Sequence, residues 1–160
     1  MLAYAKRRTR FLRHRCLRRT FFDEFDDFLI TTIGGDAQNE DTNQFWGLLV
    51  NFFFSPVGGC QTRATPFTRI LWAFDAFNTF TFLSLDGPKT ARFGQTVTLT
   101  VRNGTNNALN PIAGASVGGG FGTTGADGTV RVRLTSRGVT TFKAEKEGTI
   151  RSNVLSILVV

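Results

Sequence analysis

The single histidine is the first residue to consider for catalysis, and its place in the chain argues against that role. His14 lies in an Arg-rich N-terminal stretch. A Ser-His-Asp or Cys-His site needs an imidazole beside its nucleophile in the folded body. The two cysteines, Cys16 and Cys60, are 44 positions apart, whereas a zinc site needs about four clustered ligands. We therefore predict no catalytic residue, no metal site, no cofactor and no enzyme activity.

Two aspartates are the remaining candidates for acid–base chemistry, as a carboxylate pair of the glycosidase type. Asp127 precedes Gly128 in the string TGADG, and an Asp-Gly pair is typical of a tight turn. Asp75 lies inside the apolar run ILWAFDAF, where a half-buried carboxylate would accept hydrogen bonds from the backbone. We expect a structural role for both residues.

Aromatic residues supply the candidate ligand-binding residues. Trp46, Trp72 and Phe74, with Asp75 beside them, could line a groove, because small-molecule sites are mostly apolar with a few polar groups. The alternative, which we prefer, is that these side chains fill a core. A pocket that reaches solvent would favour the groove, and a filled space between the two tryptophans would favour the core.

A glycosylation sequon, Asn103-Gly-Thr, follows the alternating segment 95–102. We expect it to lie in a polar loop that spans 103–110. Asn103 is therefore a possible glycosylation site, which matters only in a eukaryotic secretory setting.

Basic residues are concentrated at the N-terminus. Of nineteen basic residues, eight lie in the first 20 positions, which hold no acid. The rest of the chain holds eleven basic and twelve acidic residues, so we expect no nucleic-acid binding by the folded body. The basic stretch is a disordered tail, an upstream extension outside the natural mature protein, or a mitochondrial-type presequence, and these interpretations stay open.

Hydropathy gives no membrane or secretion signal. The sequence contains no run of about 18 apolar residues, so we predict no membrane span. A secretory signal combines a basic start with an uninterrupted apolar stretch, and here basic residues recur throughout the first 20 positions.

Alternating apolar residues predict an all-β fold. Apolar residues alternate with polar ones, or β-branched residues predominate, in the segments 79–85, 95–102, 138–146 and 153–160. We expect the apolar run 45–54 to be one strand buried on both faces.

A hairpin is expected near the middle of the C-terminal half. The segments 113–117 and 130–134 each alternate apolar with other residues. We expect them to be antiparallel neighbours joined through the Asp127-Gly128 turn.

Composition divides the chain into three parts. Residues 1–27 form a basic head and acidic linker that we expect to be disordered, and 28–85 form a small β-sheet domain. Asp86-Gly-Pro-Lys89 marks the boundary. Beyond it, 86–160 is expected to form an antiparallel β-sandwich.

Two parts of the sequence resemble known families. The strings GQTVTLTV, PIAGASV, TTGADGTVRVRL and TFKAEKEGTIRSNVLSILV, in that order, resemble bacterial Ig-like and carboxypeptidase-regulatory-like sandwiches of surface and secreted proteins. Upstream, FWGLLVNFFFSPVGGCQ and RILWAFDAFN resemble a secreted domain similar to the C-terminal β domain of transcobalamin. This domain often precedes an Ig-like module.

The resemblance implies a small β-sheet module followed by an Ig-like β-sandwich, in an extracellular or cell-surface protein. The family places Cys60 in a disulfide with a cysteine of a preceding β segment. Here the Arg-rich head stands in place of that segment and of a signal peptide, so the chain looks N-terminally truncated or re-started.

The family has no well-established activity. We therefore expect a non-catalytic binding or spacer module whose partner is an extracellular or cell-surface protein or a carbohydrate. The alternative is a small-ligand carrier that uses the aromatic-rich β domain, and a hydrolase is the least favoured function.

Overall fold

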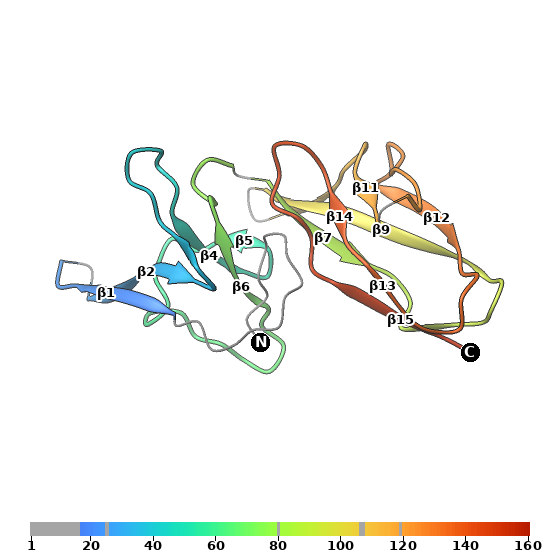
Figure 1. The fold of residues 1–160 in the computed structure, drawn as a ribbon, viewed down its shortest axis with the longest axis horizontal. Helices are drawn as coiled ribbons and strands as arrows, with labels where there is room; N and C mark the ends of the chain where they lie inside the picture. The colour runs from blue at the N-terminus through green and yellow to red at the C-terminus, as the bar shows by residue number, and fades with distance from the viewer. Residues whose placement is uncertain (1–16, 25, 80, 106–107, 119) are drawn as a thin grey trace. The chain divides into compact units, whose positions relative to one another are not determined.

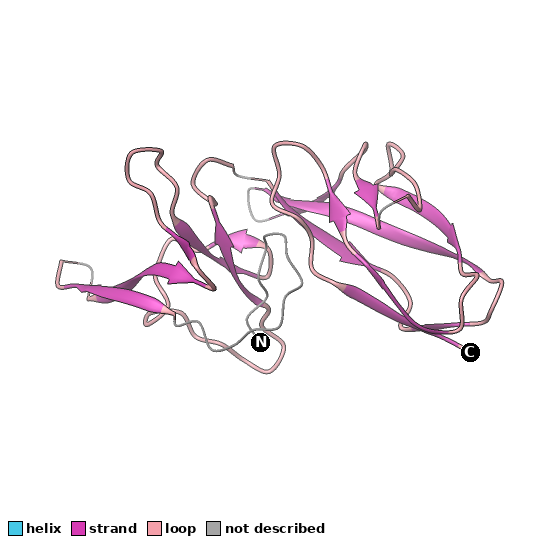
Figure 2. Ribbon diagram, viewed as in Figure 1, coloured by secondary structure: helices cyan, strands magenta, loops and turns pink. Residues whose placement is uncertain are grey.

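The computed structural model describes residues 17–160 except 25, 80, 106–107 and 119. Within these residues every regular element is a β-strand, so the predicted all-β class is confirmed (Figures 1 and 2). No helix in the described ranges is long and apolar enough to cross a membrane. The chain divides into two compact units, Met1–Phe80 and Thr81–Val160, and each is described by itself.

Unit 1 is built from short antiparallel strands. Its described residues form two three-stranded sheets, ordered β1-β2-β3 and β5-β4-β6. Between β2 and β4 lies a small core that contains Ile30, Trp46 and Phe74. The strands are β1 (Arg18–Phe22), β2 (Asp27–Ile33), β3 (Asp36–Ala37), β4 (Trp46–Val50), β5 (Phe53–Phe54) and β6 (Ile70–Phe74).

The first strand corrects the prediction that residues 1–27 are disordered. β1 pairs antiparallel with β2, with Thr20 opposite Leu29. Phe21 packs edge-to-face on Phe28 at a centroid distance of 4.9 Å, and the Arg19 guanidinium lies 4.0 Å from the same Phe28 ring. These contacts and the backbone pairing offset the repulsion between neighbouring arginines. The rest of the predicted head, residues 1–16, lies outside the described residues.

The apolar run 45–54 is a hairpin and not the single buried strand that we predicted. Asn51 and Phe52 have φ angles of 52° and 70°, as a two-residue turn of type I′ requires. The turn pairs Val50 with Phe53. Asn51 is held in place because its Oδ1 accepts a hydrogen bond from Arg69 N at 2.9 Å.

Unit 2 is a sandwich around one core. The long strand β9 pairs with β7 along one edge and with β12 and β10 along the other. A second sheet has the order β13-β15-β8, and β11 pairs with β14. Inward residues of these sheets form a single buried cluster. The strands are β7 (Phe82–Asp86), β8 (Thr90–Ala91), β9 (Thr96–Thr105), β10 (Ala108–Pro111), β11 (Ser116–Val117), β12 (Thr129–Arg133), β13 (Gly138–Phe142), β14 (Ala144–Glu145) and β15 (Leu155–Val159).

The boundary between the units lies between Phe80 and Thr81, before the predicted break after residue 85. β7 pairs with β9, so it belongs to unit 2. The Gly-Pro break is packed inside unit 2, because a Cβ on Gly87 would lie 2.6 Å from a Leu99 methyl and 2.8 Å from a Leu155 methyl.

The predicted hairpin of 113–117 with 130–134 is wrong, although its turn exists. β11 pairs with β14, and β12 pairs with β9, so the two strands have different partners. The residues between them fold back on 113–117, because Thr124 N donates to Ala115 O at 2.9 Å and Thr124 Oγ1 accepts from Ala115 N at 3.0 Å. This local pairing leaves β12 to pair with β9.

The Asp127-Gly128 turn is confirmed. Gly128 has a φ of 72°, and its N–H donates to Gly125 O at 2.9 Å. The Asp127 carboxylate accepts from Thr129 N at 2.9 Å and from Thr129 Oγ1 at 2.8 Å. These bonds hold the pKa of Asp127 below its ordinary value of 3.8, because the backbone N–H and then the hydroxyl of Thr129 favour the charged form.

We expect Gly128→Val to lower the free energy of unfolding by about 3 kcal/mol. Its φ favours glycine, and a Cβ there would lie 2.6 Å from Val101 O and 3.0 Å from Ile112 N. Gly148→Val is the matched control, because Gly148 has a φ of 71° but no atom within 4 Å of its Cβ position. It should cost about 1 kcal/mol. Urea melts measure both, and equal costs would mean that the turn does not pack against β9.

A candidate site around Asp27

The predicted aromatic residues come together as a packed cluster. Trp46 is 2% exposed, and its indole N–H donates to Asp36 O at 3.0 Å. Its ring meets that of Phe74 edge-to-face at 5.2 Å. Trp72 is half-buried against the same cluster. This packing favours the core interpretation of these residues.

Asp75 follows β6 in a turn and has a φ of 62°. Its carboxylate accepts from Gln44 Nε2 at 3.4 Å and from Asn78 Nδ2 at 2.5 Å. Asn78 Nδ2 also donates to Asn43 O at 3.2 Å. The partners of the carboxylate are thus side-chain amides, where we expected backbone donors, and together they tie the turn after β6 to the loop before β4.

Asn103 lies inside β9 and not in the predicted loop. It pairs with Asn110 of β10 and with Leu83 of β7. Its Oδ1 is buried and has no hydrogen-bond partner among the described residues. Hydrophobic alternation could not predict this placement, because the strand continues through polar residues as far as Thr105.

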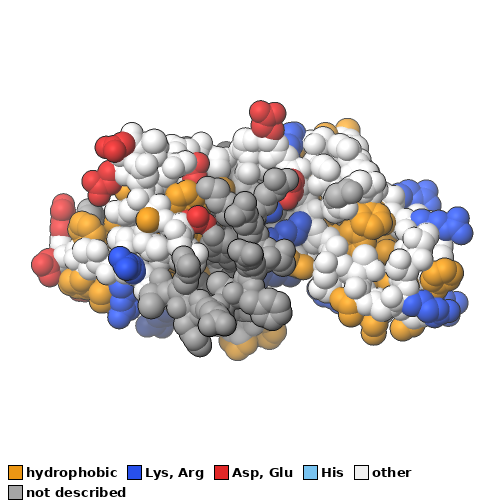
Figure 3. Space-filling view, viewed as in Figure 1, with side chains coloured by type: hydrophobic (Ala, Val, Ile, Leu, Met, Phe, Trp, Pro, Cys, Tyr) orange, Lys and Arg blue, Asp and Glu red, His pale blue; other side chains and the backbone are white. Residues whose placement is uncertain are grey.

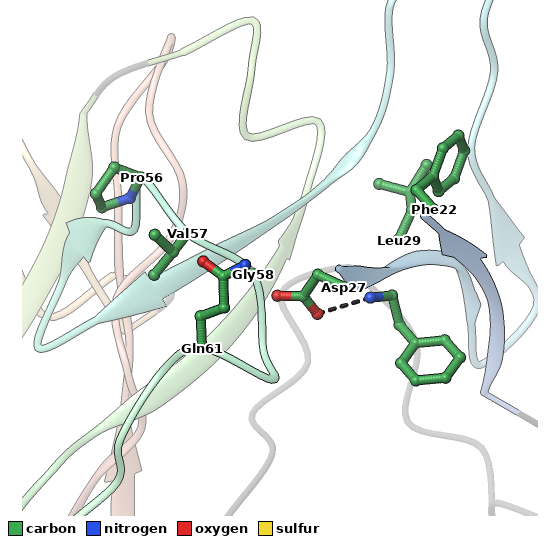
Figure 4. A pocket seen from close by; sticks show the side chains of 8 residues that line it. Phe22, Asp27, Leu29, Pro56, Val57, Gly58 and Gln61 are labelled. Atoms are coloured by element: carbon green, nitrogen blue, oxygen red, sulfur yellow. Dashed lines mark hydrogen bonds between the residues drawn. The ribbon is translucent and has the colours of Figure 1, made fainter. Parts of the chain in front are cut away.

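A pocket of about 310 Å³ opens in unit 1 beside Asp27 (Figure 4). Its walls come from the end of β1, the start of β2 and the loop after β5, and most of the side chains are apolar. The lining residues are Phe22, Asp27, Phe28, Leu29, Pro56, Val57, Gly58 and Gln61.

The Asp27 carboxylate connects β2 to this loop. The side chain is only 6% exposed, and its Oδ1 accepts hydrogen bonds from Phe28 N at 2.6 Å and from Cys60 N at 3.1 Å. Its Oδ2 is buried, with no hydrogen-bond partner among the described residues. Burial raises the pKa of Asp27, but the N–H groups of Cys60 and Phe28 outweigh burial and bring this pKa below its ordinary value. The carboxylate is therefore charged at neutral pH.

Gly58 lets the loop approach this carboxylate. A Cβ at Gly58 would overlap both Asp27 Oδ2 and the carboxyl carbon, so only glycine allows this approach. Figure 4 shows the Asp27 carboxylate directed at the loop that carries Gly58 and Gln61. Thr62 Oγ1 donates to Gly58 O at 2.8 Å and fixes the loop on its far side.

Cys60 lies beside the same carboxylate as a free, exposed thiol. The hydrogen bond to Asp27, with burial and the negative charge of Asp27 as further causes, raises the pKa of the Cys60 thiol above its ordinary value. The other cysteine, Cys16, lies outside the described residues. No three Cys, His or carboxylate side chains of the described residues cluster closely enough to hold a metal ion.

Sequence reasoning missed Asp27 because it belongs to the string FFDEFDD, which we interpreted as a solvated linker. Asp26 is exposed and Asp27 is buried, because the loop that carries Gly58 and Cys60 packs on the Asp27 carboxylate. The Gly58-Gly59 pair before Cys60 was the one available signal, because consecutive glycines often mark a close backbone approach.

Comparison with models of known protein families, with curated proteins and with solved structures gives no match for this chain.

We expect Asp27→Asn to remove part of the acid sensitivity of unit 1. Because the folded-state pKa of Asp27 lies below 3.8, its charge stabilises the fold fully above that pH, and this stabilisation is lost as the pH falls through the folded pKa. The variant should be about 1–3 kcal/mol less stable at pH 7, and this deficit should shrink below about pH 4.

Urea melts between neutral and acidic pH measure this difference. Asp26→Asn is the control, because that neighbouring side chain is exposed and the change should leave the melts unchanged. If the loss of unfolding free energy in Asp27→Asn stays constant from neutral to strongly acidic pH, the Cys60 loop does not stabilise the charged form of Asp27.

Proposed function

We propose that the chain is a non-catalytic extracellular or cell-surface module that contributes binding or spacing. The observation that supports this proposal is that three aspartates of the chain each form hydrogen bonds that hold a loop or turn. Asp27 binds the backbone of the Cys60 loop, Asp75 ties a turn to the loop before β4, and Asp127 closes its own turn. Each is engaged in a separate part of the fold, whereas acid–base catalysis needs groups that converge on one substrate.

Further carboxylates are held by ion pairs. Asp86 Oδ2 lies 3.4 Å from Arg102 Nη1, and Glu145 Oε1 lies 3.1 Å from Arg151 Nη1. The compartment in the proposal comes from the resemblance of 86–160 to sandwiches of surface and secreted proteins. Two compact β units in one chain suit a protein that presents surfaces and loops to a partner.

A small-ligand carrier is the second candidate, and the pocket beside Asp27 favours it. Its apolar walls and single charged group are typical of small-molecule sites. The ligand class that fits is a compact apolar molecule with an ammonium group directed at Asp27. Phenethylamine should then raise the unfolding midpoint, and ethylbenzene should raise it less. Equal shifts would rule out a role for the carboxylate.

We expect Asp75→Asn to have the same catalytic activity as the parent protein on every substrate tested. Asparagine keeps one oxygen acceptor for the amides of Gln44 and Asn78, so the cost in unfolding free energy should be about 1 kcal/mol. The measurement is a panel of ester, glycoside, peptide and phosphate substrates, run on parent and variant beside a denaturant melt. A parent activity that disappears in a variant with an unchanged melt would overturn the proposal.

A further inference from the structure

The near-neutral charge of residues 17–160 is an average over two segments of opposite charge, whereas unit 1 as a whole, Met1–Phe80, holds ten basic and eight acidic residues. Residues 17–80 hold four basic and eight acidic residues, whereas 81–160 hold nine basic and four acidic residues. Unit 2 therefore has a net charge of +5. A positive domain attracts anionic partners over distances of about one Debye length, roughly 8–10 Å.

Two of the four acids of unit 2 adjoin the sheet of β9 and β12, because Asp127 binds Thr129 at the start of β12 and Asp86 of β7 is opposite Thr100 of β9. Asp86 pairs with Arg102, and Glu145 pairs with Arg151. Asp127 accepts hydrogen bonds within its own turn, and Glu147 is exposed in the turn before Gly148. Among the described residues of unit 2, Arg131 and Arg133 therefore make no ion pair with a carboxylate.

The outward face of β9 and β12 combines guanidinium groups with a row of hydroxyls. Val130 and Val132 point into the core, so Arg131 and Arg133 alternate with them on the outside, where both are exposed. Across the ladder, Arg131 is opposite Thr98 and Arg133 is opposite Thr96. Residues directly opposite are about 5 Å apart, and alternate residues along one strand are about 7 Å apart. The sheet thus fixes the spacing of the backbone positions that carry these two arginines and two threonines.

Two more arginines lie at the end of the sheet that holds Arg133. Gly94 N donates to Leu134 O at 2.7 Å, which joins the turn before β9 to the end of β12. This turn carries the exposed Arg92. The Arg137 guanidinium lies 5.3 Å from the centroid of the adjacent Phe93 ring. At the end of unit 2 on the right of Figure 3, the visible surface shows basic and apolar side chains and no acidic ones.

Guanidinium groups in this arrangement match repeated anionic groups. Arginine presents a planar fork of N–H donors that binds sulfate or carboxylate through two hydrogen bonds, and a strand fixes the spacing of the Cα atoms from which two such side chains extend. The threonine hydroxyls beside them donate and accept hydrogen bonds, as the hydroxyls of a sugar do. The outward positions of β9 from 96 to 100 and of β12 carry Thr and Arg in the described structure and no aromatic ring, whereas sites for single-stranded nucleic acid stack bases on aromatic side chains.

We propose that the outward face of β9 and β12 binds a linear acidic polysaccharide. Arg131 and Arg133 contact its sulfate or carboxylate groups, and Thr96 and Thr98 contact its sugar hydroxyls. This inference rests on the proposed binding function and names the class of partner and the surface that recognises it.

The test compares two double variants of the full chain that lose the same charge. Arg131→Gln with Arg133→Gln removes both guanidiniums of the face. Arg63→Gln with Lys146→Gln removes two exposed cations elsewhere. Both variants keep the basic N-terminal stretch, so its contribution to binding is common to them. Dextran sulfate and polygalacturonate are the sulfated and carboxylated probes, and neutral dextran and duplex DNA are the comparison ligands.

We expect the Arg131/Arg133 variant to bind one or both acidic polysaccharides about tenfold more weakly than the parent, because each lost contact is a charge-assisted hydrogen bond. The Arg63/Lys146 variant should change the Kd by less than about twofold. The probe that shows the tenfold loss identifies sulfate or carboxylate as the recognised group. Equal weakening by the two variants, or equal affinity for neutral dextran, would overturn the proposal.

Thr98→Val separates recognition of a polysaccharide from attraction of any polyanion. Valine keeps the strand propensity and the shape of threonine and removes only the hydroxyl. We expect it to weaken polysaccharide binding about twofold to threefold, since one neutral hydrogen bond is lost, and to leave DNA binding unchanged. Tighter binding of duplex DNA than of either acidic polysaccharide would overturn the assignment. If the polysaccharide experiments fail, the proposal that the chain is non-catalytic still stands or falls by the substrate panel alone.

Discussion

Buried polar side chains that bind the backbone are the constraint on which both units depend. Short strands leave many N–H groups outside any ladder, and a buried N–H without a partner costs free energy. In unit 1, Asp27 binds the N–H groups of Phe28 and Cys60. In unit 2, Thr124 binds Ala115 N and Ser152 binds Ala144 N at 2.8 Å. All three polar residues are buried, so each fixes the path of a loop from inside the protein.

The strands of unit 2 could be predicted from the sequence, but their pairing could not. Alternation reports which residues face a core, and the alternating apolar residues of β9, β12 and β15 are buried as predicted. It does not report which strand lies next to which. The Asp127-Gly128 turn suggested adjacent strands, yet β11 and β12 lie in different sheets because 113–124 satisfies its own backbone first.

The same limit explains what was missed in unit 1. The turn at Asn51-Phe52 carries no glycine, so its two left-handed residues are held by Arg69 and by the pairing of β4 with β5. The burial of Asp27 depends on a loop about 30 positions further along the chain. The tryptophans were easier, because large aromatic residues in an apolar run are usually buried, and Trp46 is. The candidate site therefore lies where long-range contacts, and not local pattern, decide the environment.

The position of Cys60 next to Asp27 bears on the reactivity of its thiol. Disulfides form by attack of a thiolate, so the rate of exchange falls as the thiolate fraction falls. A neighbouring carboxylate lowers that fraction, and the same negative charge repels anionic oxidants such as glutathione disulfide. We therefore expect the exposed Cys60 thiol to form disulfides, including any between two copies of the chain, more slowly than a cysteine without a neighbouring carboxylate.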